Sequence, residues 1–234
     1  MIITNRPQLD ERQCCVIDFD GVVYDLMYSV EIYLHTHEGL HFKRENVLTY
    51  DFNKSLDDTF CKGEFIDIPT SLGVSRDRIF SAMADPEVYA FDTYCSGVKE
   101  AIENVSDIVP VVIYSYCLSD DMVYAKAKLF ESCFGGMPNV YYCVTSDRVK
   151  DTYPNALYVV EDSIENLDKY ILDNNIAVSG IGTGLYLVDQ SYNQELYNQR
   201  YASSLKHFVR VSSCVDALER ICASYYIVNA CLEV

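Results

Sequence analysis

The chain has 234 residues, half of them hydrophobic and 23% charged, with few glycines and prolines, which excludes a disordered or fibrous protein. Its formal net charge of −17 disfavours a nucleic-acid polymer or an anionic membrane as partner, because both require basic side chains. A small anion stays compatible with this charge, since a bound cation can reverse the local sign.

The beginning of the chain and its cysteines indicate the cellular setting. Residues 1–13, MIITNRPQLDERQ, are polar and contain no apolar core of signal-peptide length. The longest apolar runs, such as 108–117, reach about half of the length that a membrane crossing requires. The ten cysteines include no CxxC pair, so we expect reduced, mostly buried thiols. These features predict a cytoplasmic protein without disulfides or a membrane partner, and homo-oligomeric assembly is left open.

Short apolar runs alternate with helical patterns along most of the chain. The run 14–19, CCVIDF, is continuous and apolar, as expected of a central parallel strand that is covered on both faces. In 96–105 the apolar residues repeat with helical spacing. The later predicted elements are, in order, a strand at 109–115, a helix from Asp121, strands at 140–146, 156–162, 184–190 and 207–213, and a helix at 215–228. This alternation predicts an α/β fold, a Rossmann-like parallel sheet flanked by helices with right-handed crossovers.

The segment from Leu26 to about Ala90 interrupts the alternation, because it contains helical stretches and no strong buried-strand signal. Asp25 is expected to cap the first of these helices, and Ser75 is expected to cap a later one. We therefore predict a small helical cap inserted after the first strand. The predicted division is a catalytic core at 14–26 plus 91–225, a helical cap at 27–90 and an N-terminal segment at 1–13.

Acidic residues follow the first predicted strand in the stretch DFDGVVYD. Asp18 and Asp20 would share a face of an ideal strand, and Gly21 allows a sharp turn just beyond them. The carboxyl ends of strands are where open α/β sheets place their ligands. Two carboxylates this close repel each other unless a proton or a cation separates them, and an all-oxygen cluster suits Mg²⁺. A loop with incidental acids is the alternative for DFDG alone, whereas the early position of Gly21 excludes an EF-hand.

Further reactive side chains follow other predicted strands. Ser115 ends the strand VVIYS, Lys150 follows the next strand, and Glu161 and Asp162 end the strand after that. A hydroxyl, an ammonium group and two kinds of carboxylate at neighbouring strand ends are what phosphoryl transfer requires. Each signal alone is weak, but their order and spacing together indicate this chemistry.

The sequence resembles the haloacid dehalogenase (HAD) superfamily of phosphatases, whose four motifs occur in the same order. The resemblance extends from Cys14 to about Ile221, and the predicted cap stands where this superfamily often carries one. The four matching motifs are DFDGVVYD at 18–25, VVIYS at 111–115, Lys150, and VVEDSIEN at 159–166. The resemblance implies an enzyme, a hydrolase acting on phosphoric monoesters.

Within the superfamily the chain looks most like the 5′(3′)-deoxyribonucleotidases and related phage or bacterial nucleotidases. The cues are the short gap from Lys150 to the acidic pair, the tripeptide YDF at 50–52 and the segment LVDQSYN at 187–193. The acidic pair of that family is usually Asp-Asp, so Glu161 is a departure. Either Glu161 or Asp162 could therefore meet the metal, and we favour Asp162.

The resemblance also implies a role for each motif residue. Asp18 would attack phosphorus and form an aspartyl-phosphate, while Asp20 would protonate the departing oxygen and later activate water. Mg²⁺ would be held by Asp18, the acidic pair and the backbone carbonyl of Asp20. Ser115 and Lys150 would bind the phosphoryl oxygens.

The cap is expected to choose the substrate. Its aromatic residues offer flat surfaces on which a nucleotide base can stack. Tyr50 and Phe52 are the substrate-binding candidates, with Phe60 and Phe65 nearby. For any one of these residues, a place in the small core of the cap is the simpler interpretation.

A competing motif lies at 37–41, where HEGLH spells the zinc-binding pattern HExxH. Gly39 weakens a helix at this point, so we expect it just past a helix C-terminus, with His37 in the last turn and His41 in the following loop. Glu64 is a candidate third ligand, but nothing in the surrounding pattern singles it out.

The leading functional hypothesis is a Mg²⁺-dependent phosphomonoesterase that hydrolyses nucleoside monophosphates. The first alternative is another phosphotransfer reaction on the same scaffold: a sugar-phosphate phosphatase, a phosphomutase or a polynucleotide-end phosphatase, the last disfavoured by the acidic surface. The second is a non-catalytic nucleotide-binding protein. Retention of both opening aspartates argues against that possibility.

Overall fold

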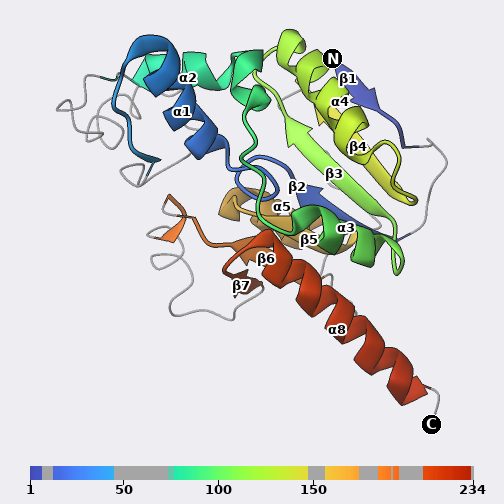
Figure 1. The fold of residues 1–234 in the computed structure, drawn as a ribbon. Helices are drawn as coiled ribbons and strands as arrows, with labels where there is room; N and C mark the ends of the chain where they lie inside the picture. The colour runs from blue at the N-terminus through green and yellow to red at the C-terminus, as the bar shows by residue number, and fades with distance from the viewer. Residues whose placement is uncertain are drawn as a thin grey trace.

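The computed structural model describes residues 1–6, 13–44, 74, 76–146, 156–173, 184–190, 192–194 and 208–232. Within them, seven strands form a single sheet with helices packed on both faces (Figure 1). The predicted α/β fold is confirmed, because every neighbouring pair of strands runs parallel except the pair at one edge.

The strand order is β1-β4-β3-β2-β5-β6-β7. The strands are β1 (Ile2–Thr4), β2 (Cys14–Asp18), β3 (Val111–Tyr116), β4 (Val140–Thr145), β5 (Ala156–Glu161), β6 (Gly184–Val188) and β7 (Val209–Val211). β2 to β7 match the strands expected from the sequence. β1 is a finding of the structure, because it pairs antiparallel with β4 from within a segment for which no element was expected.

β2 lies in the middle of the sheet, between β3 and β5, and all five of its residues are buried. Its side chains alternate between two apolar layers. Cys15 and Ile17 join the layer on one face, and Cys14 and Val16 join the layer on the other. Burial on both faces explains why this strand reads as a continuous apolar run and does not alternate with polar residues.

The helices of the core cover the two faces unequally in the described part of the chain. Helices α3 (Val98–Ser106), α4 (Asp120–Phe134) and α8 (Cys214–Leu232) supply apolar side chains to the layer that contains Ile17. Helix α5 (Ile164–Asp173) supplies the opposite layer. In Figure 1, α8 packs beside α3 and then extends beyond the sheet. Among the described residues, no helix is both long enough and apolar enough to cross a bilayer.

The segment after β2 contains the helices predicted there. They are α1 (Leu26–Glu38), α2 (Arg76–Met83) and the 3₁₀ helix η6 (Pro86–Ala90), and they contact one another. Asp25 caps α1 as expected, because its carboxylate accepts a hydrogen bond from the Tyr28 N–H at 3.0 Å. Ser75 and residues 45–73 lie outside the described residues, and the division into core, cap and N-terminal segment stays a prediction.

The HExxH pattern does not form a zinc-binding helix. Gly39 ends α1 in the left-handed conformation, with φ at 65°, as expected of a residue just past a helix C-terminus. His37 therefore lies in the last turn, and its Nδ1 is 3.2 Å from the carbonyl oxygen of Tyr33. His41 follows the helix and does not continue it. Glu64, the candidate third ligand, lies outside the described residues.

Candidate active site

The chain turns sharply at Gly21, just beyond Asp18, which ends β2, and Asp20, which follows it. Gly21 has φ of +80°, and the turn is closed by the Tyr24 N–H, which donates to the Phe19 carbonyl at 2.9 Å. A Cβ at position 21 would overlap the carboxylate of Asp162 and the hydroxyl of Tyr192. Glycine is therefore needed here both for the backbone conformation and for the close approach of a second strand end.

Three carboxylates meet at the carboxyl ends of β2 and β5. Asp18, Glu161 and Asp162 each contribute an oxygen, and these oxygens lie within 4.8 Å of one another. The three residues are only 7%, 3% and 5% exposed, so their charges are held away from bulk water. Buried carboxylates this close repel each other unless a cation or protons intervene. An all-oxygen set of this kind fits a hard cation such as Mg²⁺.

Neighbouring polar groups hold the acidic triad, Asp18, Glu161 and Asp162, in place. The Tyr192 hydroxyl donates to Oδ2 of Asp162. The Asn166 side-chain amide donates to Oε1 of Glu161 at 3.0 Å. The Asn193 amide donates to the backbone carbonyl of Asp162 at 3.0 Å. Hydrogen bonds of this kind orient carboxylates before a metal binds and strengthen its binding.

Asp20 has different surroundings from Asp18. The Ser115 hydroxyl, from the end of β3, donates to Oδ2 of Asp20 at 3.0 Å. The ammonium group of Lys126, from α4, donates to the same Asp20 oxygen and to Oγ of Ser115, the latter at 2.8 Å. The carboxylate, the hydroxyl and the ammonium group thus all hydrogen-bond to one another, as a group separate from the acidic triad. These are the groups that bind or protonate phosphoryl oxygens.

The structure brings together most of the predicted site residues. Asp18, Glu161 and Asp162 form one group, and Asp20 and Ser115 form the other. Both members of the acidic pair lie within reach of one ion, so the question of which of them binds the metal stays open. The Asp20 side chain is held by Ser115 and Lys126, and metal binding by its backbone carbonyl stays a prediction.

Three predicted site residues lie outside the described residues. They are Lys150, Tyr50 and Phe52; the nearby aromatic residues Phe60 and Phe65, which were not among the site residues, lie outside as well. Their roles in phosphoryl and base binding therefore stay predictions.

Lys126 is one of the site residues that the sequence analysis missed. Its signal was present in the helical pattern of α4. Met122, Val123, Ala127 and Phe130 are the buried stripe of this helix, and Lys126 occupies a position within that stripe. A lysine on the apolar face of a helix must have a buried partner, because burying an unpaired charge costs several kcal/mol or more. That position could have marked it as a site candidate.

Tyr192 and Asn193 belong to the segment LVDQSYN, which supported the nucleotidase resemblance. Neither residue was assigned a role from the sequence. The structure places both against Asp162, as described above. Gln190 of the same segment donates to the Gly21 carbonyl at 2.6 Å, so this segment supports the turn as well as the triad.

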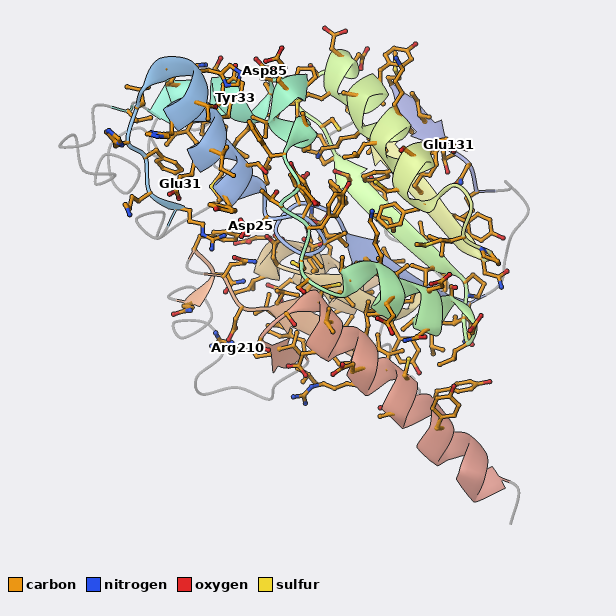
Figure 2. The ribbon with its side chains drawn as sticks, in the orientation of Figure 1. Asp25, Glu31, Tyr33, Asp85, Glu131 and Arg210 are labelled. Atoms are coloured by element: carbon orange, nitrogen blue, oxygen red, sulfur yellow. The ribbon has the colours of Figure 1, made fainter. Side chains whose placement is uncertain are left out.

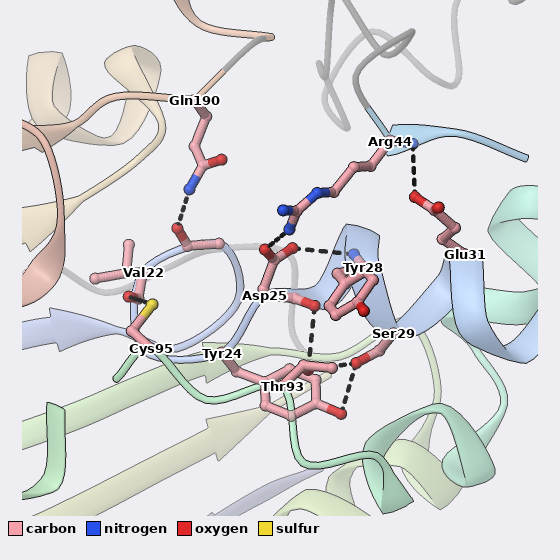
Figure 3. A network of polar contacts seen from close by, with 11 residues as sticks. Val22, Tyr24, Asp25, Tyr28, Ser29, Glu31, Arg44, Thr93, Cys95 and Gln190 are labelled. Atoms are coloured by element: carbon pink, nitrogen blue, oxygen red, sulfur yellow. Dashed lines mark hydrogen bonds and ion pairs between the residues drawn. The ribbon is translucent and has the colours of Figure 1, made fainter. Parts of the chain in front are cut away.

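Buried hydrogen bonds join the turn to α1 and to Thr93, as Figure 3 shows. The Ser29 hydroxyl donates to the Tyr24 hydroxyl at 2.8 Å and lies 2.5 Å from the Thr93 hydroxyl. The Asp25 N–H donates to the Thr93 carbonyl at 2.9 Å, and Arg44 forms an ion pair with the Asp25 carboxylate. Burial raises the pKa of Tyr24 despite the hydrogen bonds of its neighbours, so its hydroxyl stays a neutral link. These contacts join the segment that leads from β2 into α1 to Thr93, in the segment that leads from η6 to α3.

A second link joins α1 to η6. The Tyr33 hydroxyl donates to Oδ2 of Asp85 at 2.7 Å, and the two side chains face each other in Figure 2. Asp85 also accepts from the Glu87 N–H at 2.9 Å and so caps η6. These contacts fix the end of the helical segment that returns to the core.

Cys117 is the thiol next to the Asp20 group. Burial raises its pKa to about 11, an effect opposed by Lys126 and reinforced by Asp20. A thiol with this pKa is almost fully protonated at neutral pH and is therefore a poor nucleophile. Among the described residues near the turn, the carboxylates are therefore better candidates for a nucleophile than this thiol.

Comparison with known proteins gives structural neighbours only. No family model matches the chain, and neither does any protein in the curated set. Similar solved structures include a haloacid dehalogenase-like hydrolase from Burkholderia xenovorans LB400, with 13% identity over 92% of this chain and 98% of that chain, at a TM-score of 0.49. CbbY from Rhodobacter sphaeroides, in complex with phosphate, has 15% identity over 88% and 96%, at a TM-score of 0.45. L-2-haloacid dehalogenase from Xanthobacter autotrophicus has 12% identity over 90% and 98%, at 0.45. The fold class rests on the strand order and pairing described above.

Proposed function

We propose that the protein is a Mg²⁺-dependent phosphomonoesterase that hydrolyses nucleoside monophosphates through an aspartyl-phosphate intermediate. One observation carries the proposal. A buried acidic triad and a carboxylate–hydroxyl–ammonium group meet at the ends of three adjacent parallel strands, β3, β2 and β5, with the ammonium group supplied by α4, and each contains one of the two aspartates of DFDG. Phosphate-ester hydrolysis needs both a cation site and a proton donor at one place.

Asp18 is the nucleophile of the proposed reaction. Its carboxylate attacks phosphorus, the ester oxygen departs, and an aspartyl-phosphate forms, which divides a difficult hydrolysis into two easier displacements. Asp18, Glu161 and Asp162 would hold Mg²⁺ in this step. The bound ion would reduce the repulsion between the nucleophile and the phosphoryl oxygens.

Asp20 is the proton donor and acceptor of the proposed reaction. It protonates the departing oxygen in the first step and takes a proton from the attacking water in the second. Ser115 holds Asp20 before substrate arrives and can donate to a phosphoryl oxygen when substrate is bound. Lys150 is assigned the second phosphoryl contact on the basis of the sequence motif alone.

The nucleotide is the more specific part of the proposal, and it rests on the sequence. The YDF tripeptide, the LVDQSYN segment and the short gap before the acidic pair support it. An acidic chain is also better suited to a small phosphate ester than to a nucleic-acid polymer. Tyr50 and Phe52 are proposed to contact the base. A cytoplasmic location of the protein is a separate part of the proposal.

A substrate panel tests the proposal. Phosphate release is measured from nucleoside 5′- and 3′-monophosphates and from sugar monophosphates, each with Mg²⁺ and with EDTA. We expect Mg²⁺-dependent release from nucleotides and little from sugar phosphates. Activity confined to sugar phosphates would replace the substrate and keep the chemistry. Absence of release from every ester would favour a nucleotide-binding protein.

A further inference from the structure

Lys126 is a buried cation to which neither the sequence motifs nor the proposed reaction assigns a role. We propose that it is a positioning residue for Asp20: it holds one carboxylate oxygen of Asp20 so that the other oxygen is the one presented to substrate. The inference rests on the proposed function, since it concerns how the proton donor of that reaction is oriented.

The first support is the location of the ammonium group. The Lys126 side chain has no exposed surface, although it belongs to a helix whose other face meets solvent. Its Nζ lies 4.6 Å from the centre of the Tyr89 ring and 5.7 Å from that of Phe19. Aromatic faces stabilise a cation, but they do not replace the water that a buried ammonium group loses. The partner that compensates for this loss is the Asp20 carboxyl group, which accepts at Oδ2 and carries the proton of its acid form on Oδ1.

The second support is the division of labour between the two oxygens of Asp20. Lys126 and Ser115 both donate to Oδ2. Oδ1 is buried and accepts no hydrogen bond from any described residue. A buried polar oxygen without a partner is unfavourable in the resting protein and is rare in native structures, and a catalytic role is one recognised reason for it. The geometry therefore leaves Oδ1 as the oxygen that meets the leaving group.

The third support is the connection through Ser115. The Lys126 ammonium group donates to Oγ of Ser115, which in turn donates to Asp20. The direction of the hydroxyl proton is fixed by this arrangement, because Oγ accepts from lysine and must donate elsewhere. Lys126 thus orients both groups that are proposed to act on the phosphate ester. Its loss should let the Asp20 side chain rotate, and small misplacements of this kind are costly in catalysis.

A pair of aryl phosphates tests this role. Phenyl phosphate has a poor leaving group that needs a proton, whereas p-nitrophenyl phosphate has a good leaving group that needs little help. For Lys126→Met we expect kcat for phenyl phosphate to fall about 10–100-fold, the range for a displaced catalytic group. The kcat for p-nitrophenyl phosphate should fall much less, and KM should change little for either ester.

Three further variants complete the experiment. Lys128→Met is the matched control, because Lys128 is exposed on the same helix, and both rates should stay at the wild-type value. Lys126→Gln keeps a hydrogen-bond donor, so its kcat for phenyl phosphate should lie between those of the wild type and Lys126→Met. The glutamine variant also replaces Lys126→Met in the experiment if the methionine variant is unstable. In an Asp20→Asn background, Lys126→Met should have no further effect, because both changes act on one group.

The outcomes separate this inference from the proposed function. Equal losses on both esters, or a full additional loss in the Asp20→Asn background, would overturn the positioning role while an active wild type upholds the phosphatase. A wild type that releases no phosphate from either aryl ester or from any member of the substrate panel with Mg²⁺ would overturn the proposed function, and the Lys126 role with it. Selective loss on phenyl phosphate that disappears in the Asp20→Asn background supports the role.

Discussion

Asp18 and Asp20 stand two residues apart in one motif, yet they lie in different chemical surroundings. Asp18 meets two more carboxylates at the end of β5. Asp20 meets a hydroxyl from β3 and an ammonium group from α4. The first environment attracts a cation, and the second supplies positive charge itself. Two residues of one motif thus receive opposite electrostatic surroundings from the elements packed on either side of them.

The largest expected effect comes from removing Asp18, the proposed nucleophile. Asp18→Asn keeps the size of the side chain and removes the attacking carboxylate. Phosphate release should fall to the background rate, because no aspartyl-phosphate can form. Circular dichroism and thermal unfolding check that the fold remains. Turnover near the wild-type rate would show that another residue attacks phosphorus.

The second prediction separates the two aspartates. Asp20→Asn should slow the release of a poor leaving group by about 10²–10⁴-fold, the usual range for general acid–base catalysis. It should leave Mg²⁺ binding by the side chains of the triad in place. The rate and the Mg²⁺-induced rise in unfolding temperature are therefore measured on the same variant. Loss of the rise along with the rate would mean that the two groups act as one site.

The third prediction concerns the cation itself. Mg²⁺ at about 100 times its Kd should stabilise the folded protein by about 2.7 kcal/mol, or roughly 5–10 °C for a chain of this size. EDTA should reverse the rise, and Asp162→Asn should weaken or abolish it. Asp216→Asn removes an acid on α8 and is the control, for which the rise should persist. An unchanged rise in Asp162→Asn would move the metal away from the triad.

The fourth prediction tests the support behind the triad. Tyr192→Phe removes the hydroxyl that donates to Asp162 and leaves the ring in place. Loss of a group that orients a metal ligand typically weakens metal binding about 10–100-fold. The Mg²⁺ concentration at half-maximal activity should rise accordingly, with little change in kcat at saturating Mg²⁺. Tyr226→Phe, at an exposed position of α8, is the control. Equal Mg²⁺ dependence in wild type and Tyr192→Phe would leave Tyr192 with a packing role only.

The sequence predicted the strands and their acidic ends because both depend on local patterns. A strand covered on both faces is apolar throughout, so β2 and β3 were visible as continuous runs. Asp18, Ser115 and Asp162 each follow such a run, and parallel strands bring their carboxyl ends to one edge. Asp25 and Gly39 were predictable for a similar reason, since helix caps are chosen by the adjacent backbone.

What the sequence could not supply is contact between distant segments. Lys126 lies 106 positions from Asp20, and no local pattern names its partner. Tyr192 lies 30 positions from Asp162, with α5 and β6 between them in the chain. β1 is three residues long and polar at its end, so its pairing depends on the exposed edge of β4. Each of these depends on tertiary packing, which overrides weak local preference.

The smallest expected effect comes from Asp85, the residue that caps η6. Burial acts to raise the pKa of Asp85, but hydrogen bonds from the Tyr33 hydroxyl and the Glu87 N–H outweigh it and hold that pKa below its ordinary value. A carboxyl with a lowered folded pKa stabilises the protein above its unfolded pKa of about 3.9, and the benefit disappears as pH falls through the folded pKa. Asp85→Ala should therefore lower the free energy of unfolding by about 1 kcal/mol at neutral pH, the usual effect of losing a helix cap.

The pH dependence of the free energy of unfolding distinguishes the helix cap Asp85 from the acidic triad. The difference between wild type and Asp85→Ala, measured by urea unfolding, should shrink as the pH is lowered below about 4, because the wild-type carboxyl then takes up a proton. Glu103→Ala, which removes an exposed carboxylate from α3, should change stability by less than about 0.5 kcal/mol at either pH. The Mg²⁺-induced rise in unfolding temperature should be the same in Asp85→Ala as in wild type, since Asp85 caps η6 and does not belong to the triad. A reduced rise would show that the link between α1 and η6 also shapes the acidic triad, through the hydrogen bonds that join Tyr24, Ser29 and Thr93.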